Sequence, residues 1–588
     1  MNDRTKIGLQ ILQVAVIVGV AGDVLLRVTP WGLNVLLFNV VFATAMIMLL
    51  RRHAPEQLTR NTIALFGAQI FFAAMFVWRD AEQLLVADAL AIITILSVLF
   101  LPRIKVPAQI AGAFHYVVGF IWSALNAAFA PGILLSSDIK WSNMPRTGWR
   151  KHALAAARGL AIAAPFILIF GGLFMAADAA YEGLVQRVCN IMPETVFTHV
   201  LLFSIFAWLS AGYLRGVLMD PVDSVESIIT SVEPTSENVS KVAGLRTDSG
   251  EHPVTLPDNK SVVDHLNTSD PQDAEEQKAE TRAAGSVPSD DGKKNWSWAN
   301  IDNSIMPTAF TLGTVEIGVI FGLVNLLFLS FVTVQVPYLF GGMELVQNTP
   351  DFKLAEYARR GFGELVAVSA IVLPMLLVSH WLIRKETRTA ENLFRSLAGV
   401  QIVLLFVIMA SAVQRLVLLT GNLGYGMTTV RLYPLIFMMW LGVVFVLFAA
   451  TVLRGARQHF AWAALWSAFL ILGATHVFNP DEFIVRHNLA LMREGREFDA
   501  TYNFSLSDDA APALFGAFDL LSQDQQKAAA FEFARRYCRL SEENELRSFN
   551  FSRHAARPLF EQNKELIEIL SLCDSARFCC EHGKLGFE

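Results

Sequence analysis

The stretch from Gln83 to Leu101 reads QLLVADALAIITILSVLFL, and Asp88 is its only charged residue. A hydrocarbon layer ~30 Å thick takes ~20 helical residues to cross, so this run is long enough to span a bilayer. An unpaired backbone group in lipid costs several kcal/mol, and the run lacks the alternation of a barrel strand. The stretch therefore predicts a transmembrane α-helix.

Runs of the same kind recur along the chain and predict an all-α integral membrane protein with about 11–13 transmembrane helices. Of the 588 residues, 54% are hydrophobic and only 17% are charged, against ~25% charged in an ordinary soluble domain. This composition excludes a secreted disulfide scaffold, a disordered chain and a cytosolic enzyme. The predicted spans lie near 7–26, 31–50, 61–78, 83–101, 107–130, 154–177, 197–218, 308–332, 362–383, 396–419, 431–453 and 458–478.

Polarity divides the chain into four parts. Residues 1–218 form a first membrane half with about 7 hydrophobic segments, and 305–478 form a second half with about 5 transmembrane helices. Between them, 219–304 holds 17 acidic and 7 basic residues with repeated prolines, which predicts a disordered acidic linker. After the last span, 479–588 is polar with apolar residues at helical spacing, so a small helical soluble C-terminal domain is expected.

Lysine and arginine recur in every second short loop, as at Arg4, Arg51 and Arg103. Because cytoplasmic loops carry this excess, the N-terminus and the linker are expected on the cytoplasmic side. The basic residues between 140 and 151 conflict with simple counting. This conflict leaves open that 107–130 re-enters the membrane without crossing it.

The chain contains no recognisable catalytic motif, so neither an enzyme nor a cofactor is predicted. Residues 579–582, Cys-Cys-Glu-His, offer fewer ligands than a structural zinc site uses, so no metal is predicted. If the last span leads outward, the tail meets an oxidising compartment, where Cys538 would pair with Cys573, Cys579 or Cys580. No basic stripe predicts nucleic-acid binding.

Four ionisable residues fall inside predicted spans, namely Asp88, His115, Glu316 and Arg415. Such a group costs at least ~2.5–3.5 kcal/mol in the bilayer and usually marks a pathway or a pair. Glu316 falls about eight residues into its span, where we expect it to be protonated or paired with a cation such as Arg415. A buried polar site for a proton or solute and a set of interhelical hydrogen bonds both fit this pattern.

Small residues predict where helices approach closely. Gly318 and Gly322 form a G-x-x-x-G within 308–332, a spacing that suits close helix contact. One face of 107–130 carries a stripe of small and polar residues, formed by Gly112, His115, Gly119, Trp122 and Asn126.

Scattered blocks of residues carry a resemblance to a known family. The candidate site residues within these blocks are Asp23, Arg27, Gln335, Tyr338, Gly341, Gly342, Glu356, Arg360, Glu364, Tyr425 and Arg431. Further blocks in the tail are Asn479–Asp481, Leu506–Ala510 and Arg547–Asn550. Together they resemble a bacterial multi-pass membrane family catalogued only as a domain of unknown function, number 4173, which is related to number 4153. The resemblance implies a multi-pass protein of the bacterial plasma (inner) membrane and supplies no activity.

Two function classes stay open. The first is a solute or proton-coupled transporter that uses an intramembrane polar site. The alternative is a non-enzymatic membrane sensor or scaffold that binds a protein partner through its C-terminal domain or linker. Membrane lipid is an expected partner in both cases, and the sequence leaves the oligomeric state open.

Overall fold

The computed structural model describes residues 3–104, 106–140, 194–219, 311–340, 362–383, 388–422, 426–542 and 546–565. The predicted span 154–177 and the expected linker 219–304, apart from Met219, lie outside the described residues. The candidate residues that also lie outside them are Gly341, Gly342, Glu356, Arg360 and Tyr425, together with Cys573, Cys579 and Cys580 of the predicted disulfide.

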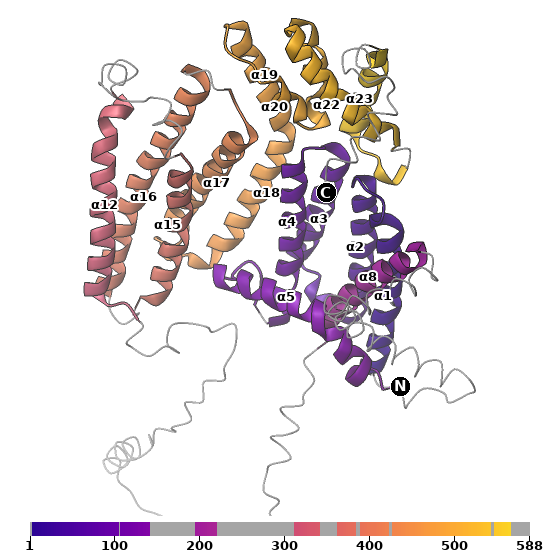
Figure 1. Cartoon of the computed structure of the whole chain (residues 1–588). Helices are drawn as coiled ribbons and strands as arrows, with labels where there is room; N and C mark the ends of the chain where they lie inside the picture. Colours follow the sequence, from indigo (N-terminus) through magenta and orange to yellow (C-terminus); the bar gives the residue numbers. More distant parts are fainter. Residues whose placement is uncertain are drawn as a thin grey trace, which may run out of the picture. The chain divides into compact units, whose positions relative to one another are not determined.

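Among the described residues, 11 helices are long and apolar enough to cross a membrane, and no strand forms. The first group comprises α1 (Asp3–Leu26), α2 (Leu33–His53), α3 (Arg60–Trp78), α4 (Glu82–Leu99), α5 (Ala113–Ile133) and α8 (Glu194–Leu218) (Figure 1). The second group comprises α12 (Thr314–Phe340), α15 (Phe362–Leu382), α16 (Arg388–Val417), α17 (Thr429–Thr451) and α18 (Phe460–Phe478). The chain is thus an all-α multi-pass membrane protein, as the sequence predicts.

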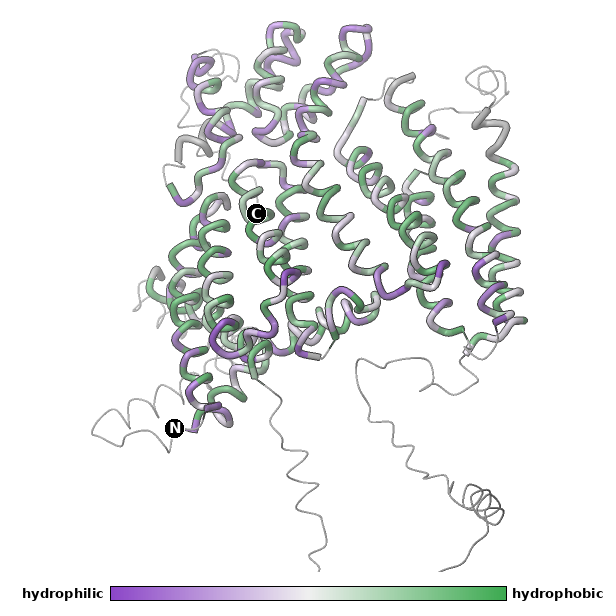
Figure 2. The backbone as a smooth tube through the Cα atoms, turned by 180° about the vertical axis from the view of Figure 1, so that it is seen from behind, coloured by the Kyte–Doolittle hydropathy of each residue, from purple (hydrophilic) through white to green (hydrophobic). Residues whose placement is uncertain are grey.

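The outer surface of the two groups is apolar. Figure 2 shows mostly hydrophobic residues along these helices and more hydrophilic ones on the tail. Exposed side chains include Met48, Phe129, Leu326 and Leu470. A continuous apolar surface of this kind is stable in lipid and not in water, which is why the helices must lie in a membrane.

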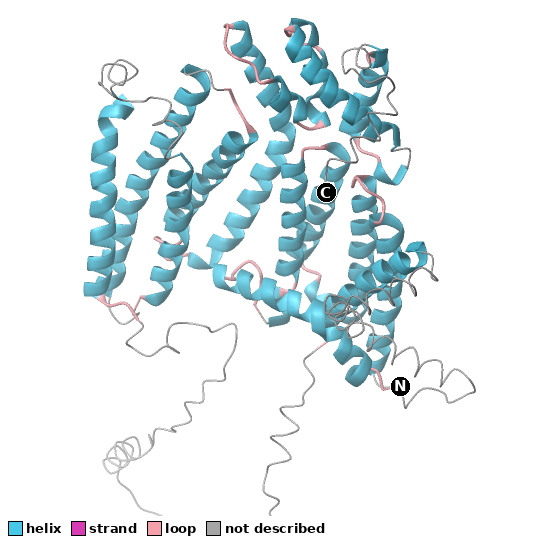
Figure 3. Ribbon diagram, viewed as in Figure 1, coloured by secondary structure: helices cyan, strands magenta, loops and turns pink. Residues whose placement is uncertain are grey.

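Helix α5 runs in a different direction from α1–α4. Figure 1 and Figure 3 show it lying across one end of α4, whereas α2, α3 and α4 run side by side. Helix α5 is nonetheless long and apolar enough to cross a membrane, so the re-entrant alternative that the basic residues between 140 and 151 leave open stays a prediction.

The tail packs directly on the second group. It contains α19 (Pro480–Arg493), α20 (Ala500–Ser505), α21 (Ala511–Phe515), α22 (Gln523–Glu542) and α23 (Phe551–Gln562). Its hydrophobic core includes Met427 and Leu432, which belong to the start of α17 and its preceding loop. The described residues before 220 and after 310 form one compact unit.

Close contacts of α8 depend on glycine. A Cβ atom at Gly212 would lie 2.4 Å from the carbonyl oxygen of Asn126 and 2.5 Å from that of Ala127, both on α5. On α1, a Cβ atom at Gly22 would lie 2.4 Å from the ring of Phe206 on α8. Because the neighbours of Gly212 are backbone atoms, they have less freedom to move aside than a side chain.

Helix α12 packs closely on α16, but this contact does not depend on Gly318 or Gly322. A Cβ atom at Gly318 would meet Leu393 at an ordinary 3.5 Å, and one at Gly322 would meet nothing within 4 Å.

Two contacts define how α12 and α16 pair. The rings of Phe321 and Phe394 meet edge to face with centroids 5.3 Å apart, and Asn325 Nδ2 donates to the Leu397 carbonyl oxygen at 2.9 Å. Residue numbers increase together along these contacts, so the two helices run in the same direction.

Gly212→Ala should lower the melting temperature of the detergent-solubilised protein. The added methyl group has no room against α5, and overpacking of this kind typically costs about 1–3 kcal/mol. Gly322→Ala is the matched control and should leave the melting temperature unchanged or slightly higher, because it meets open space. Equal melting temperatures for the two variants would contradict the close approach of α8 to α5.

Candidate functional site

Asp88 of α4 and His476 of α18 form a buried pair that joins the two helix groups. Asp88 Oδ1 and His476 Nε2 lie 2.9 Å apart, and both side chains are 0% exposed. Asp88 Oδ2 and His476 Nδ1 have no hydrogen-bond partner among the described residues. Buried polar atoms are seldom left in this state, so the pair is a candidate for a role beyond packing.

Arg79, directly after α3, connects this pair to the tail. Its Nε donates to the backbone oxygen of His476 at 2.8 Å, and its Nη1 lies 3.6 Å from Asp509 Oδ1. The buried Asp509 also accepts, through Oδ2, the N–H groups of Asp80 and Ala81 at 2.9 Å each. One carboxylate therefore satisfies two backbone donors in the turn between α3 and α4 and balances the charge of Arg79.

A second buried carboxylate, Asp481, lies in the first turn of α19. Ser507 donates its N–H group at 3.0 Å and its hydroxyl at 2.6 Å to Asp481 Oδ2, and the same hydroxyl lies 3.3 Å from Asp509 Oδ2. Asp481 Oδ1 has no hydrogen-bond partner among the described residues. Burial raises the pKa of Asp481 above its ordinary value, although the Ser507 hydrogen bonds act in the opposite direction.

A capping residue places Asp481 at this position. Asn479 has a left-handed φ of 54°, and its side chain accepts the N–H group of Glu482. Pro480 occupies the first helical position, where its missing N–H group costs no hydrogen bond. These local signals begin α19 immediately after α18 ends, which brings Asp481 close to the bundle.

Asn550 fixes the start of α23 against α3. Its Oδ1 accepts the Arg553 N–H group at 3.1 Å, while its Nδ2 donates to the carbonyl oxygens of Phe76 and Arg79 at 2.8 Å each. Arg553 Nη1 in turn lies 2.8 Å from Asp80 Oδ1. The side chain that caps a tail helix therefore also satisfies the last carbonyl groups of a membrane helix.

The opening block of the chain meets the tail in the same region. Leu33 donates its N–H group to the Phe549 carbonyl oxygen at 3.0 Å, and Arg553 Nη2 donates to the Trp31 carbonyl oxygen at 3.1 Å. A Cβ atom at Gly32 would lie 2.3 Å from that Phe549 oxygen. Only glycine leaves room for this contact.

The block around Arg431 meets α19 in a similar way. Asn488 accepts the Met427 N–H group at 2.6 Å and donates to its carbonyl oxygen at 3.0 Å. Gly426, whose φ is +71°, lies under the Asn488 side chain, and Arg431 donates to the Gly426 carbonyl oxygen. Blocks that are far apart in the sequence therefore converge where the tail meets the membrane helices. We call this region the tail junction, formed by Arg79, Asp80, Asp481, Ser507, Asp509, Asn550 and Arg553.

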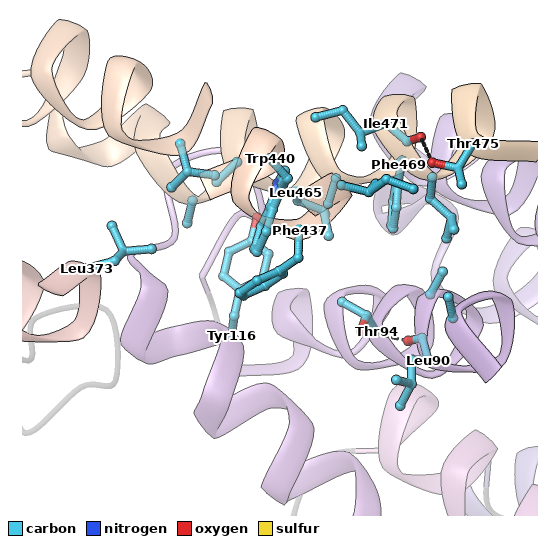
Figure 4. Close-up of a pocket in the computed structure, with 18 of the residues that line it drawn as sticks. Leu90, Thr94, Tyr116, Leu373, Phe437, Trp440, Leu465, Phe469, Ile471 and Thr475 are labelled. Carbon is cyan, nitrogen blue, oxygen red and sulfur yellow. Dashed lines mark hydrogen bonds between the residues drawn. The ribbon is translucent and has the colours of Figure 1, made fainter. Parts of the chain in front are cut away.

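A cavity of about 620 Å³ lies between α4, α5, α15, α17 and α18 (Figure 4). Its lining comes from both helix groups and is almost entirely apolar. The side chains that Figure 4 labels along it are Leu90, Thr94, Tyr116, Leu373, Phe437, Trp440, Leu465, Phe469, Ile471 and Thr475. Asp88 and His476 do not line the cavity, but Ala87 and Thr475 beside them do, so the buried pair lies directly behind its wall.

The other predicted residues of the first group have local partners. Asp23 Oδ2 lies 2.6 Å from His199 Nδ1 of α8, so the two contribute to the contact of α1 with α8. His115 accepts the Gly112 N–H group at 3.1 Å and thereby caps the start of α5. Arg27 directly follows the end of α1. Asp23, His115 and Arg27 do not belong to the tail junction, and none of the three lines the cavity.

The prediction that Glu316 lies deep in a span is wrong. Helix α12 begins at Thr314, so Glu316 is in its first turn and is exposed, where a carboxylate interacts favourably with the helix dipole. Pairing with Arg415 is also wrong, because α12 and α16 run in the same direction and Arg415 lies in the last turn of α16. The contacts above place Glu316 level with about residue 389 of α16, so at 1.5 Å per residue Arg415 lies roughly 40 Å further along the bundle.

Glu364 also lies exposed in a first turn, that of α15, while Gln335 and Tyr338 lie in the last turns of α12. The residues that sequence reasoning missed are His476, Arg79 and Asp509. The resemblance includes Ser507–Asp509 within one of its blocks but assigns no role to them. Nothing in the sequence indicates that Asp509 accepts hydrogen bonds from residues more than 400 positions away.

The described residues hold no group of three or more His, Cys, Asp or Glu side chains placed to bind a metal ion. A family model described as a domain of unknown function (DUF4153) matches residues 66–242 and 282–515 of the chain. No curated protein and no solved structure matches it.

His476→Leu should sharply reduce the melting temperature and the yield of folded protein. The change leaves Asp88 buried without its partner, and breaking a buried pair in this way costs ~3–5 kcal/mol. The double variant Asp88→Leu with His476→Leu should recover part of that loss. Val477→Leu, at an exposed position on the same helix, is the control. If His476→Leu melts like Val477→Leu, the pair does not join the helix groups.

The melting temperature should depend on pH through Asp481. Because burial raises its pKa above 3.8, the folded state keeps a proton that the unfolded chain has already released. Stability contributed by this group therefore rises as the pH falls through the folded-state pKa and levels off below 3.8. Asp481→Asn should flatten that part of the profile between pH 8 and pH 4, measured by thermal melting. Asp519→Asn, at an exposed tail position, should leave the profile as it is.

Proposed function

We propose that this chain, which belongs to the family described as a domain of unknown function (DUF4153), binds a long apolar molecule between its two helix groups. The acyl chain of a lipid is the simplest such molecule in a membrane. The single observation that carries this proposal is the apolar cavity bounded by α4, α5, α15, α17 and α18.

Most of the polar side chains that line the cavity are hydrogen-bonded within the protein. Figure 4 shows two of these hydrogen bonds, from Thr94 to Leu90 and from Thr475 to Ile471. Tyr116 donates to the Ala108 carbonyl oxygen at 3.0 Å, and Trp440 donates to Ser467 at 3.2 Å. The buried hydroxyl of Tyr433 is the exception, because it has no hydrogen-bond partner among the described residues. A solute with several polar groups would therefore lose its hydration in the cavity and gain few hydrogen bonds from the lining, whereas an apolar solute has no such hydration to lose.

The cavity is elongated along the helices. Its lining runs from Leu84 to Thr94 on α4, from Tyr433 to Val444 on α17 and from Phe460 to Thr475 on α18. At 1.5 Å per residue these stretches cover ~15–22 Å, which is at least half of a ~30 Å hydrocarbon layer. An extended hydrocarbon chain fits such a space better than a compact solute does.

Proton-coupled transport is the second candidate, and the Asp88–His476 pair supports it. The pair lies behind the cavity wall and connects α4 to α18, so a change in its protonation would act on both helix groups at once. Because the cavity is apolar, the transported molecule in this case would be the apolar ligand and not a polar solute.

A sensor or scaffold role would instead use the surface of the tail. The carboxylates and capping amides of the tail junction point inward to the membrane helices and are buried there. A partner of the tail would have to bind elsewhere, and Leu520 and Phe531 are apolar side chains exposed on its surface. We rank this class below ligand binding because the apolar lining of the cavity specifies a class of ligand, whereas these two exposed side chains do not specify a partner.

Ala468→Phe should block ligand binding by filling the cavity. The probe is a long-chain fatty acid that carries a photoreactive diazirine, with its adducts located by peptide mass spectrometry. In the unaltered protein we expect adducts on cavity residues of α17 and α18, and in Ala468→Phe we expect at least a several-fold loss of them. Leu470→Phe is the matched control, because Leu470 is exposed on the same helix and does not line the cavity. Equal labelling of both variants would show that the cavity is not the binding site.

A further inference from the structure

The segment 546–552 lies beside the ends of membrane-spanning helices. Arg547 Nη1 donates to the Val24 carbonyl oxygen of α1 at 2.6 Å. Ser552 Oγ donates to the carbonyl oxygen of Trp78, the last residue of α3, at 2.9 Å. Together with the contact to the start of α2 described above, these bonds hold the segment at the level where the helices of the first group end.

Two apolar side chains of this segment project away from the protein. Leu546 is 79% exposed and Phe551 is 56% exposed. The apolar side chains beside them on or near the membrane helices are exposed as well, namely Val24 (45%), Trp31 (47%) and Trp78 (37%). Tryptophan is enriched where a span meets the membrane surface, so Trp31 and Trp78 indicate the level of the interface. The lipid-facing surface of the first group thus continues onto the tail.

We infer that Leu546 and Phe551 insert into the interfacial region of the bilayer, where they contact the glycerol and upper acyl-chain region of phospholipids. Phospholipid is the occupant because the apolar surface here is continuous with that of α1 and α3, which lipid already covers. A protein partner at this place would have to displace lipid from Val24. The tail therefore rests on the bilayer through 546–551 as well as on the helices through the tail junction.

Insertion also agrees with the chemistry of the segment. Its polar groups are used on the protein side, since Ser548, Asn550 and Arg553 are buried there. Its apolar side chains are left on the opposite side. Amphipathic segments that lie along a membrane surface also have polar groups on one side and apolar side chains on the other.

The test uses the full chain in phosphatidylcholine vesicles that contain a phosphatidylcholine with a diazirine on its acyl chain. After irradiation, adducts are located by peptide mass spectrometry. We expect adducts on 546–551 and at least tenfold fewer on Phe531, which is 58% exposed on α22, a helix that packs on α20 and α23. Equal labelling at Phe531, absence of adducts on 546–551 while Val24 is labelled, or cross-links between copies of the chain through 546–551 would each overturn the inference.

A pair of variants provides a second measurement. Leu546→Gln combined with Phe551→Gln should reduce adducts on the segment several-fold and increase protease cleavage within 546–565 by a similar factor. The melting temperature in detergent should fall only slightly, because Leu546 is largely exposed and the ring of Phe551 contacts only the edge of the protein at Phe549. Phe531→Gln should change neither adducts nor cleavage. Unchanged adducts and cleavage in the double variant would contradict insertion into lipid.

Discussion

The buried carboxylate of Asp509 is the interaction on which the arrangement of the tail and the membrane helices depends. Its Oδ2 accepts the backbone N–H groups of both Asp80 and Ala81, and its charge is balanced by Arg79 on the Oδ1 side. Without it, a turn between two spans would have unsatisfied donors in a place that excludes water. One tail residue thus completes the hydrogen bonding of α3 and α4, which ties the position of the tail to that of the first helix group.

Arg79 extends this constraint into the membrane. It holds the carbonyl oxygen of His476, and the His476 side chain holds Asp88. The polar contacts therefore run continuously from the tail carboxylates to a pair buried between α4 and α18. The same two helices line the apolar cavity, so anything that separates them would change the cavity and strain the tail junction together. A ligand in the cavity and a proton on the pair would act on the same set of contacts.

We propose two different contacts with lipid, one inside the cavity and one on the surface of the tail. The cavity offers a partly open, elongated and apolar space between the helix groups, whereas 546–551 presents apolar side chains to the bilayer around the protein. Both follow from one property of the chain, which exposes far more apolar surface than a soluble protein can. In this molecule, lipid is part of the environment that completes the fold.

The sequence by itself determined the membrane helices, because a run of about twenty apolar residues has one stable backbone conformation in lipid and needs no partner to adopt it. The ends of α15, α17 and α18 lie within two residues of the predicted spans for this reason, whereas α16 begins eight residues before its predicted span. The start of α12 was placed too early, since hydropathy does not mark a helix terminus, and Glu316 was given a depth it does not have. Asp88 could be noticed as a charge inside a span, but its partner could not, because His476 is 388 residues away. The convergence of the opening block, the Arg431 block and the tail blocks was decided only by the tertiary structure. Hydrogen bonds between such distant segments depend on how the helices pack, and the periodicity of one helix marks which face is packed without identifying the segment that it contacts.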